Sequence, residues 1–201
     1  TAMTSSRRLY FEGDLVTEGK RARVVIPYPL DSGIEAAVFT TAQMVADYEL
    51  KFVFMVGIAA GNKSRTRIGD ILVAGKALNY NQTVEIGSGD NKRRKFLHTP
   101  IAIDRNLKAR FEQMRRSKEF KQIQESAPVE NSSSEELKCH IGLLVTGSSL
   151  LRSQEKIGEI NSDYHNVLGV DMESYGFYYV LGNLPRSEAP IFASIKAVSD
   201  F

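Results

Sequence analysis

A continuous apolar run, FVFMVGI, occupies residues 52–58 and is typical of a strand that is covered on both faces of its sheet. The preceding segment, residues 34–48, carries apolar side chains at helical spacing, among them Ile34, Val38 and Val45. Further strand-like runs occupy residues 70–74, 141–145 and 191–198, and helical patterns lie between them. Buried strands that alternate with helices predict an α/β fold, a three-layer α/β/α sandwich around a central mixed, largely parallel sheet.

The rest of the chain adds shorter elements to this plan. Strands are expected at residues 9–16 and 22–27, joined by a turn at residues 18–20. Asp104 can cap a helix that carries Leu107, Phe111 and Met114 on one face. Further helices are expected at about residues 153–160 and 172–181.

The length fits one domain, residues 1–201. The chain opens without a preceding strand and stops directly after one, so we expect the domain to be incomplete at both ends. Residues 115–137 are polar, with a proline and a run of serines, and predict a flexible surface insertion.

Composition excludes several classes of partner. The chain has 26 basic and 24 acidic residues spread along its length, which gives no reason to expect nucleic acid or a membrane surface as a partner. Its longest apolar stretch, residues 52–61, is too short to span a membrane, and its first residues lack the apolar core of a signal peptide. Cys139 is the only cysteine, so we expect no internal disulfide and a cytoplasmic location. Three scattered histidines predict no metal site, and no cofactor is expected.

Three motifs carry polar or small residues beside predicted strands. Residues 57–64, GIAAGNKS, nearly match a phosphate-binding P-loop, but Asn62 replaces the second glycine and no helix follows. A small-residue loop still lets the backbone approach a flat ligand, although it can equally be a plain tight connection. In residues 169–174, GVDMES, the two carboxylates can simply complement a helix dipole. In residues 196–200, KAVSD, the acid can be an ordinary turn residue.

Taken in order, five segments give a more specific indication: VGIAAG, GDILVA, VTGSSLL, VDMES and KAVSD. Their order and spacing over residues 22–200 resemble the nucleoside phosphorylase/nucleosidase superfamily, most closely the methylthioadenosine/S-adenosylhomocysteine nucleosidases. That family shows a Gly/Ala-rich loop before a G-D-hydrophobic strand, a V-S-G segment, a V-E-M-E helix start and an R-A-I-S-D strand end. The resemblance implies a nucleoside phosphorylase-like fold, a purine nucleoside or nucleotide as substrate, and a homodimer. The implied reaction is hydrolysis of the N-glycosidic bond of an adenine nucleoside or nucleotide.

The resemblance also implies catalytic roles. Asp200 matches the aspartate that donates a proton to N7 of the purine, and Ser199 would orient its carboxyl group. An aspartate serves as such an acid when burial or neighbours raise its pKa toward neutrality. Lys196 stands where the family has arginine, which keeps the charge and loses the planar fork.

Further residues are implied to bind the substrate. Glu173 matches the glutamate that accepts hydrogen bonds from the ribose hydroxyls, and its two oxygens suit a diol. Asp171 replaces the family's usual glutamate. The remaining implied contacts are Met172 against the sugar, Leu150 and Leu151 at the base, and Ile58, Ala59 and Ala60 in the floor.

Two alternatives to a hydrolase stay open. One is a phosphorylase, in several of which an arginine precedes the glycine of the small-residue loop; the residue at that place here is Met55. The other is a binding domain that senses adenine nucleosides without cleaving them. It is favoured if the family's water-activating glutamate, which follows an Ala-Met pair, is absent; Ala2-Met3 is followed here by TSSRR. The basic run at residues 92–95 is expected to be a solvated loop, or else a contact for a 5′-phosphate.

Overall fold

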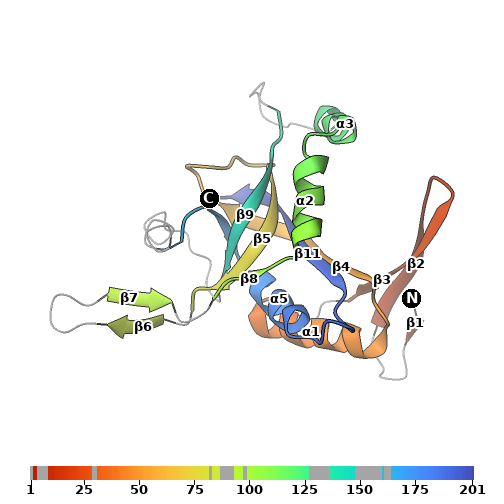
Figure 1. Ribbon diagram of the computed structural model, residues 1–201, viewed down its shortest axis with the longest axis horizontal. Coiled ribbons are helices and arrows are strands. Elements are labelled where there is room, and N and C mark those ends of the chain that lie inside the picture. The colour runs from red at the N-terminus through yellow and green to blue at the C-terminus, as the bar shows by residue number, and fades with distance from the viewer. Residues whose placement is uncertain are drawn as a thin grey trace.

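A six-stranded sheet forms the centre of the fold (Figure 1). The computed structural model describes residues 2–3, 9–28, 31–81, 83–86, 93–96, 99–126, 136–147, 160 and 164–201. In spatial order the strands are β11 (Ile191–Asp200), β4 (Phe52–Gly61), β10 (Val167–Asp171), β9 (Cys139–Thr146), β5 (Ile71–Asn79) and β8 (Ile101–Ala102). Because β11 also pairs with β5, the sheet curls round until these two strands meet.

The pairing within this sheet is mixed. Its longest ladders are parallel, joining β11 with β4, β5 with β9, and β9 with β10. The antiparallel ladders are short and join β4 with β10, β5 with β11, and β5 with β8. The predicted α/β fold with a mixed, largely parallel sheet is therefore confirmed.

Side chains from successive residues of β9 pack on opposite faces of the sheet. Leu144 belongs to the larger buried cluster, and Leu143 and Val145 belong to a second cluster. Strand side chains alternate between faces, so the sheet is buried on both sides here, as a three-layer arrangement requires. The larger cluster includes residues of α5 (Ser174–Gly182), which packs against α1 (Ile34–Asp47), as Figure 1 shows.

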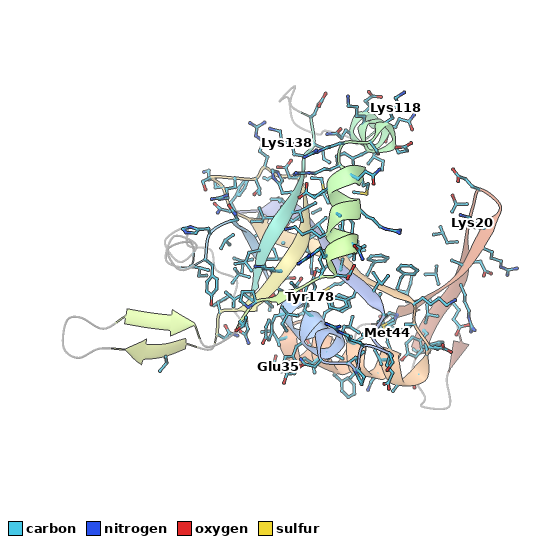
Figure 2. The ribbon with its side chains drawn as sticks, in the orientation of Figure 1. Lys20, Glu35, Met44, Lys118, Lys138 and Tyr178 are labelled. Carbon is cyan, nitrogen blue, oxygen red and sulfur yellow. The ribbon has the colours of Figure 1, made fainter. Side chains whose placement is uncertain are left out.

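Tyr178 of α5, near the middle of the molecule, forms hydrogen bonds to two strands of the curled sheet (Figure 2). Its hydroxyl donates to the carbonyl of Ala74 on β5 and accepts from the backbone N–H of Ser194 on β11, 3.1 Å away. Burial raises the pKa of this phenol far above its usual range, so the hydroxyl keeps its proton and can serve both strands.

Two more helices follow β8. Asp104 caps α2 (Arg105–Met114), as predicted, because its carboxylate accepts from the backbone N–H groups of Asn106 and Leu107. The structure differs within the polar segment 115–137, where α3 (Lys118–Ser126) forms and Phe120 is only 3% exposed. One buried aromatic side chain anchors this helix in spite of its polar composition. Residues 127–135 lie outside the described residues, as do residues 153–159 of the expected short helix.

A separate antiparallel sheet precedes α1. It contains β1 (Ala2–Met3), β2 (Leu9–Thr17) and β3 (Lys20–Pro27), and its β2–β3 ribbon projects from the body (Figure 1). Glu18 and Gly19 both have positive φ, 47° and 75°, which suits the tight turn predicted there. A second hairpin, β6 (Thr83–Ile86) and β7 (Arg93–Phe96), contains most of the basic run, which was expected to be a loop.

The structure also corrects the prediction for β4. This strand extends to Gly61, so residues 59–61 belong to it and not to the following loop. Cover on both faces was predicted, but one face is open among the described residues. Its side chains are Phe52, Phe54, Val56 and Ile58, which are 58%, 47%, 77% and 66% exposed.

Candidate active site

Asp171 is the centre of a buried polar cluster where β10 meets α5. Its side chain is 1% exposed and lies 3.1 Å from the ammonium of Lys196. The Thr146 hydroxyl donates to its Oδ1 at 2.7 Å, and the Ser174 backbone N–H donates to its Oδ2 at 3.1 Å. The Ser174 hydroxyl also donates to Oδ2. These partners satisfy both oxygens of Asp171 inside the protein.

Lys196 crosses this cluster from the middle of β11. Its ammonium bridges Asp171 Oδ2 at 3.1 Å and Glu173 Oε2 at 3.4 Å, and its side chain is 4% exposed. The residue of β4 that pairs with Lys196 is Gly57, and a Cβ at that glycine would lie 3.3 Å from the ammonium. A buried cation needs such paired carboxylates, because an unpaired one would lose its hydration without compensation.

Glu173 links this cluster to solvent. Its side chain is 27% exposed, and its Oε1 accepts from the backbone N–H of Gly33 at 3.1 Å. Glu173 is the N-cap residue of α5, yet its carboxylate makes no capping hydrogen bond to that helix. Asp171 accepts a hydrogen bond from the Ser174 backbone N–H and therefore complements the dipole of α5. That description fits Glu173 less well.

Ser199 and Asp200 end β11 beside the end of β4. The register shifts between them, since Val198 pairs with Ala59 while Asp200 pairs with Ala60, which leaves Ser199 as the extra residue of a bulge. The Ser199 hydroxyl lies 3.4 Å from Asp200 Oδ1 and 3.5 Å from the Ala59 carbonyl oxygen. Asp200 itself is exposed, so its carboxyl group faces solvent.

The loop after β4 has a structural explanation. Asn62 is buried, and its Nδ2 donates to the Val167 carbonyl at 2.9 Å while its Oδ1 accepts from the Ser64 hydroxyl at 2.8 Å. Gly61 is needed because a Cβ there would lie 2.7 Å from a methyl group of Val198. The chain then enters β5 without forming a helix, so the resemblance to a P-loop does not extend to the structure.

The predicted site residues fall into two groups. Asp171 of β10, Glu173 at the start of α5 and Lys196 of β11 form the ion-paired cluster, while Ser199 and Asp200 lie three and four residues further along β11. Met172, which lies between Asp171 and Glu173 in the sequence, is half-buried. Of the residues expected to form the floor of the site, Ala59 is buried, Ala60 is half-buried and Ile58 is exposed. Leu150 and Leu151 lie outside the described residues.

Four supporting residues were not predicted from the sequence. Thr146 and Ser174 lie inside quoted motifs, but only the fold shows that their hydroxyls hold Asp171. Ser194 extends the network, with its hydroxyl 2.7 Å from that of Ser174. Gly33 contacts Glu173 across 140 positions of sequence, and no local pattern could have indicated that contact.

Other chemistries find little support in the described part of the chain. No group of three or more histidine, cysteine or acidic side chains gathers there in a way that could hold a metal ion. Burial raises the pKa of the Cys139 thiol to about 11, so it is protonated and a poor nucleophile at neutral pH.

Among the helices that the structure describes, none has the length and apolar character needed to cross a membrane.

Comparison with known proteins gives one family and many similar folds. The family described as the phosphorylase superfamily has a model that matches residues 5–200. A methylthioadenosine/S-adenosylhomocysteine nucleosidase from Neisseria meningitidis has a TM-score of 0.68 at 22% identity, over 100% of this chain and 76% of that one. The corresponding enzyme of Helicobacter pylori has a TM-score of 0.69 at 17% identity, over 98% and 73%. A futalosine hydrolase mutant of H. pylori has a TM-score of 0.64 at 14% identity, over 94% and 80%. No curated protein sequence matches the chain.

Proposed function

Because the chain belongs to the phosphorylase superfamily, we propose that it hydrolyses the N-glycosidic bond of an adenine nucleoside or nucleotide and releases adenine. The arrangement of β11 is the observation that carries this proposal. This strand presents an exposed carboxyl group, Asp200, at its end, and through Lys196 it holds a second carboxylate, Glu173. Cleavage of the bond needs both a proton donor for the base and an acceptor for the sugar hydroxyls.

Asp200 would act as the general acid. The departing purine leaves as a neutral base if its N7 is protonated while an oxocarbenium-like sugar forms. A purine bound over this strand end would exclude water from the carboxyl group, which favours its protonated form. Ser199, 3.4 Å away, would orient the carboxyl group toward the ring.

Glu173 would hold the sugar. Each of its oxygens already accepts one hydrogen bond, from Lys196 or Gly33, and retains a lone pair for a ribose hydroxyl. Its 27% exposure leaves the carboxylate accessible to a ligand. We expect Asp171 to support this carboxylate from within the protein, because its own side chain is almost completely buried.

Hydrolysis is favoured over phosphorolysis by the residues near β4. Met55, at the position of the phosphorylases' arginine, is half-buried against the main apolar cluster and offers no charge to a phosphate. Arg65 is a possible substitute, but its guanidinium donates to the Asn166 side chain at 2.9 Å. Water is then the expected nucleophile.

The experiment is chromatography of the protein incubated with methylthioadenosine, adenosine, AMP or ATP. We expect free adenine and a free or 5′-substituted ribose, formed at the same rate with and without phosphate. Ribose 1-phosphate, or a rate proportional to added phosphate, would identify a phosphorylase. Binding of a nucleoside without release of adenine would identify a sensor. A cytoplasmic location and a homodimer stay predictions, and sedimentation equilibrium would test the homodimer.

A further inference from the structure

We infer that Lys196 is a positioning residue, which fixes the carboxylate of Glu173 for the sugar without touching the substrate itself. This inference rests on the proposed function of the site. The lysine side chain is 4% exposed, and its ammonium lies between two carboxylates on the protein side of the site. A group enclosed in this way acts on a ligand through Glu173, which reaches solvent.

The position of the ammonium is determined mainly by Asp171. The distance between Lys196 Nζ and Asp171 Oδ2 is 3.1 Å, shorter than the 3.4 Å to Glu173. Asp171 cannot move freely, because Thr146 and Ser174 hold both of its oxygens. Lys196 therefore presents a fixed positive charge to the more exposed Glu173.

Gly33 supplies the second point of attachment for Glu173. Its N–H lies just before α1 and donates to Oε1, while Lys196 donates to Oε2. Two donors on two different oxygens fix the plane of a carboxylate as well as its position. Without Lys196, two carboxylates would face each other with no cation between them, and repulsion would favour rotation of Glu173 toward solvent.

The expected consequence is selective for the sugar. Lys196→Met should weaken binding of methylthioadenosine about 10-fold or more, the scale of a lost hydrogen bond to a charged group. Adenine lacks the ribose diol, so its affinity should stay within about 2-fold of wild type. Lys196→Arg should recover most of the nucleoside affinity, because a guanidinium can also donate to both carboxylates.

The test is calorimetric titration of methylthioadenosine and of adenine into each variant, all carrying Asp200→Asn so that the nucleoside is not consumed during the titration. The protein with Asp200→Asn alone is the reference, and thermal unfolding checks the fold. In a Glu173→Gln background, Lys196→Met should cause no further loss of nucleoside affinity, since a residue that acts only through Glu173 loses its effect there. Lys138→Met is the matched control, because it makes the same chemical change at an exposed lysine just before β9. Its affinities for both ligands should equal those of the reference protein.

Equal losses of affinity for adenine and nucleoside, or additive losses in the Glu173→Gln background, would overturn the inference. If Lys196→Met does not fold, Lys196→Met/Asp171→Asn makes the same comparison without leaving an unpaired buried charge on Asp171. It should show the same sugar-selective loss. A wild-type protein that binds neither ligand would overturn the proposed function, and this inference with it, and the wild-type titration alone would show that outcome.

Discussion

Asp200 owes its place to a single extra residue in β11. Strand side chains alternate, and an unbroken register would pair Ser199 with Ala60. The shift pairs Asp200 with Ala60 instead and brings the Ser199 hydroxyl within 3.5 Å of the Ala59 carbonyl oxygen. A bulge of this kind redirects a side chain at the end of a strand. The carboxyl group consequently lies beside the small residues that end β4.

Asp200→Asn tests whether this carboxyl group is the acid. The amide keeps the shape of the side chain but has no acidic proton to give to the purine. Release of adenine from methylthioadenosine should fall by about 100-fold or more, the usual scale of general acid catalysis. The KM for the nucleoside should change by only a few-fold. Steady-state chromatographic assays over a range of methylthioadenosine concentrations measure both turnover and KM.

Asp104→Asn is a suitable control for that variant. Asp104 caps α2 and belongs to neither group of the candidate site, so the change can alter stability but should leave turnover as in wild type. Near-normal turnover in Asp200→Asn would remove Asp200 from the mechanism.

At the residue scale, the sequence named candidate side chains but did not indicate how they are connected. Asp171 and Lys196 were each predicted as departures from the family motifs, and the structure shows that they are partners, 3.1 Å apart. Nothing local relates them, because the contact depends on the placement of β10 and β11 on either side of β4 in the folded sheet. The hydroxyls of Thr146 and Ser174 escaped prediction for the same reason.

At the element scale, local patterns succeeded where an element spans a full hydrophobic period. The helix predicted at residues 34–48 is α1, Ile34–Asp47, and the two N-terminal strands appear within two residues of their expected bounds. Local patterns missed α3 for a physical reason. Its polar composition suggested a segment without a core, whereas one aromatic residue, Phe120, supplies the contact that holds the helix.

Asp70 lies just before β5 and contacts both the loop that precedes it and the start of β9. Its carboxylate accepts from the backbone N–H groups of Arg67 and Lys138, at 3.0 and 2.9 Å, and lies 2.8 Å from His140 Nε2 on β9. Burial by itself would raise the pKa of Asp70, but the hydrogen bonds from His140, Lys138 and Arg67 outweigh it and lower the pKa below its usual 3.8.

The lowered pKa predicts an acid-dependent loss of stability. A group whose pKa is lower in the folded state stabilises the fold above its unfolded pKa and loses that contribution as the pH falls through the folded value. Asp70→Asn should therefore be less stable than wild type at neutral pH. Its unfolding temperature should also fall less between about pH 5 and pH 3. Thermal unfolding at several pH values measures both, and parallel curves for the two proteins would contradict the assignment.

At the scale of the whole molecule, closure of the sheet could not be predicted. Alternating strands and helices predicted an α/β fold, but the pairing of Ile195 with Val73, on β11 and β5, joins residues far apart in the chain. Register shifts near Gly75 and Leu168 accompany the curl of the sheet. β11 carries Lys196 and Asp200, and Lys196 itself pairs with Leu72 of β5, so the closure lies at the candidate site.

The β2–β3 ribbon and β4 each have an apolar face that is exposed in the structure. On the ribbon, Phe11 pairs with Ile26, and their side chains are 48% and 55% exposed. The opposite face of the ribbon is charged, with Arg23 bonded to Glu12 at 2.7 Å. Apolar faces of this kind are uncommon on isolated domains, so whether they are covered in solution is a measurable property of the protein.

Two valines on β4 allow that measurement. Val53 is 7% exposed and Val56 is 77% exposed, so the same substitution can be compared on the two faces of one strand. Val53→Ala should cost about 2 kcal/mol of unfolding free energy, because it removes two buried methyl groups and leaves a cavity. Val56→Ala should change it by less than about 0.5 kcal/mol, as expected for an exposed site. Both variants lose the same strand propensity, so the difference between them, measured by urea unfolding, reports burial. A loss at Val56 as large as that at Val53 would show that this face is covered in solution and that the open face of β4 is not part of the surface of the protein.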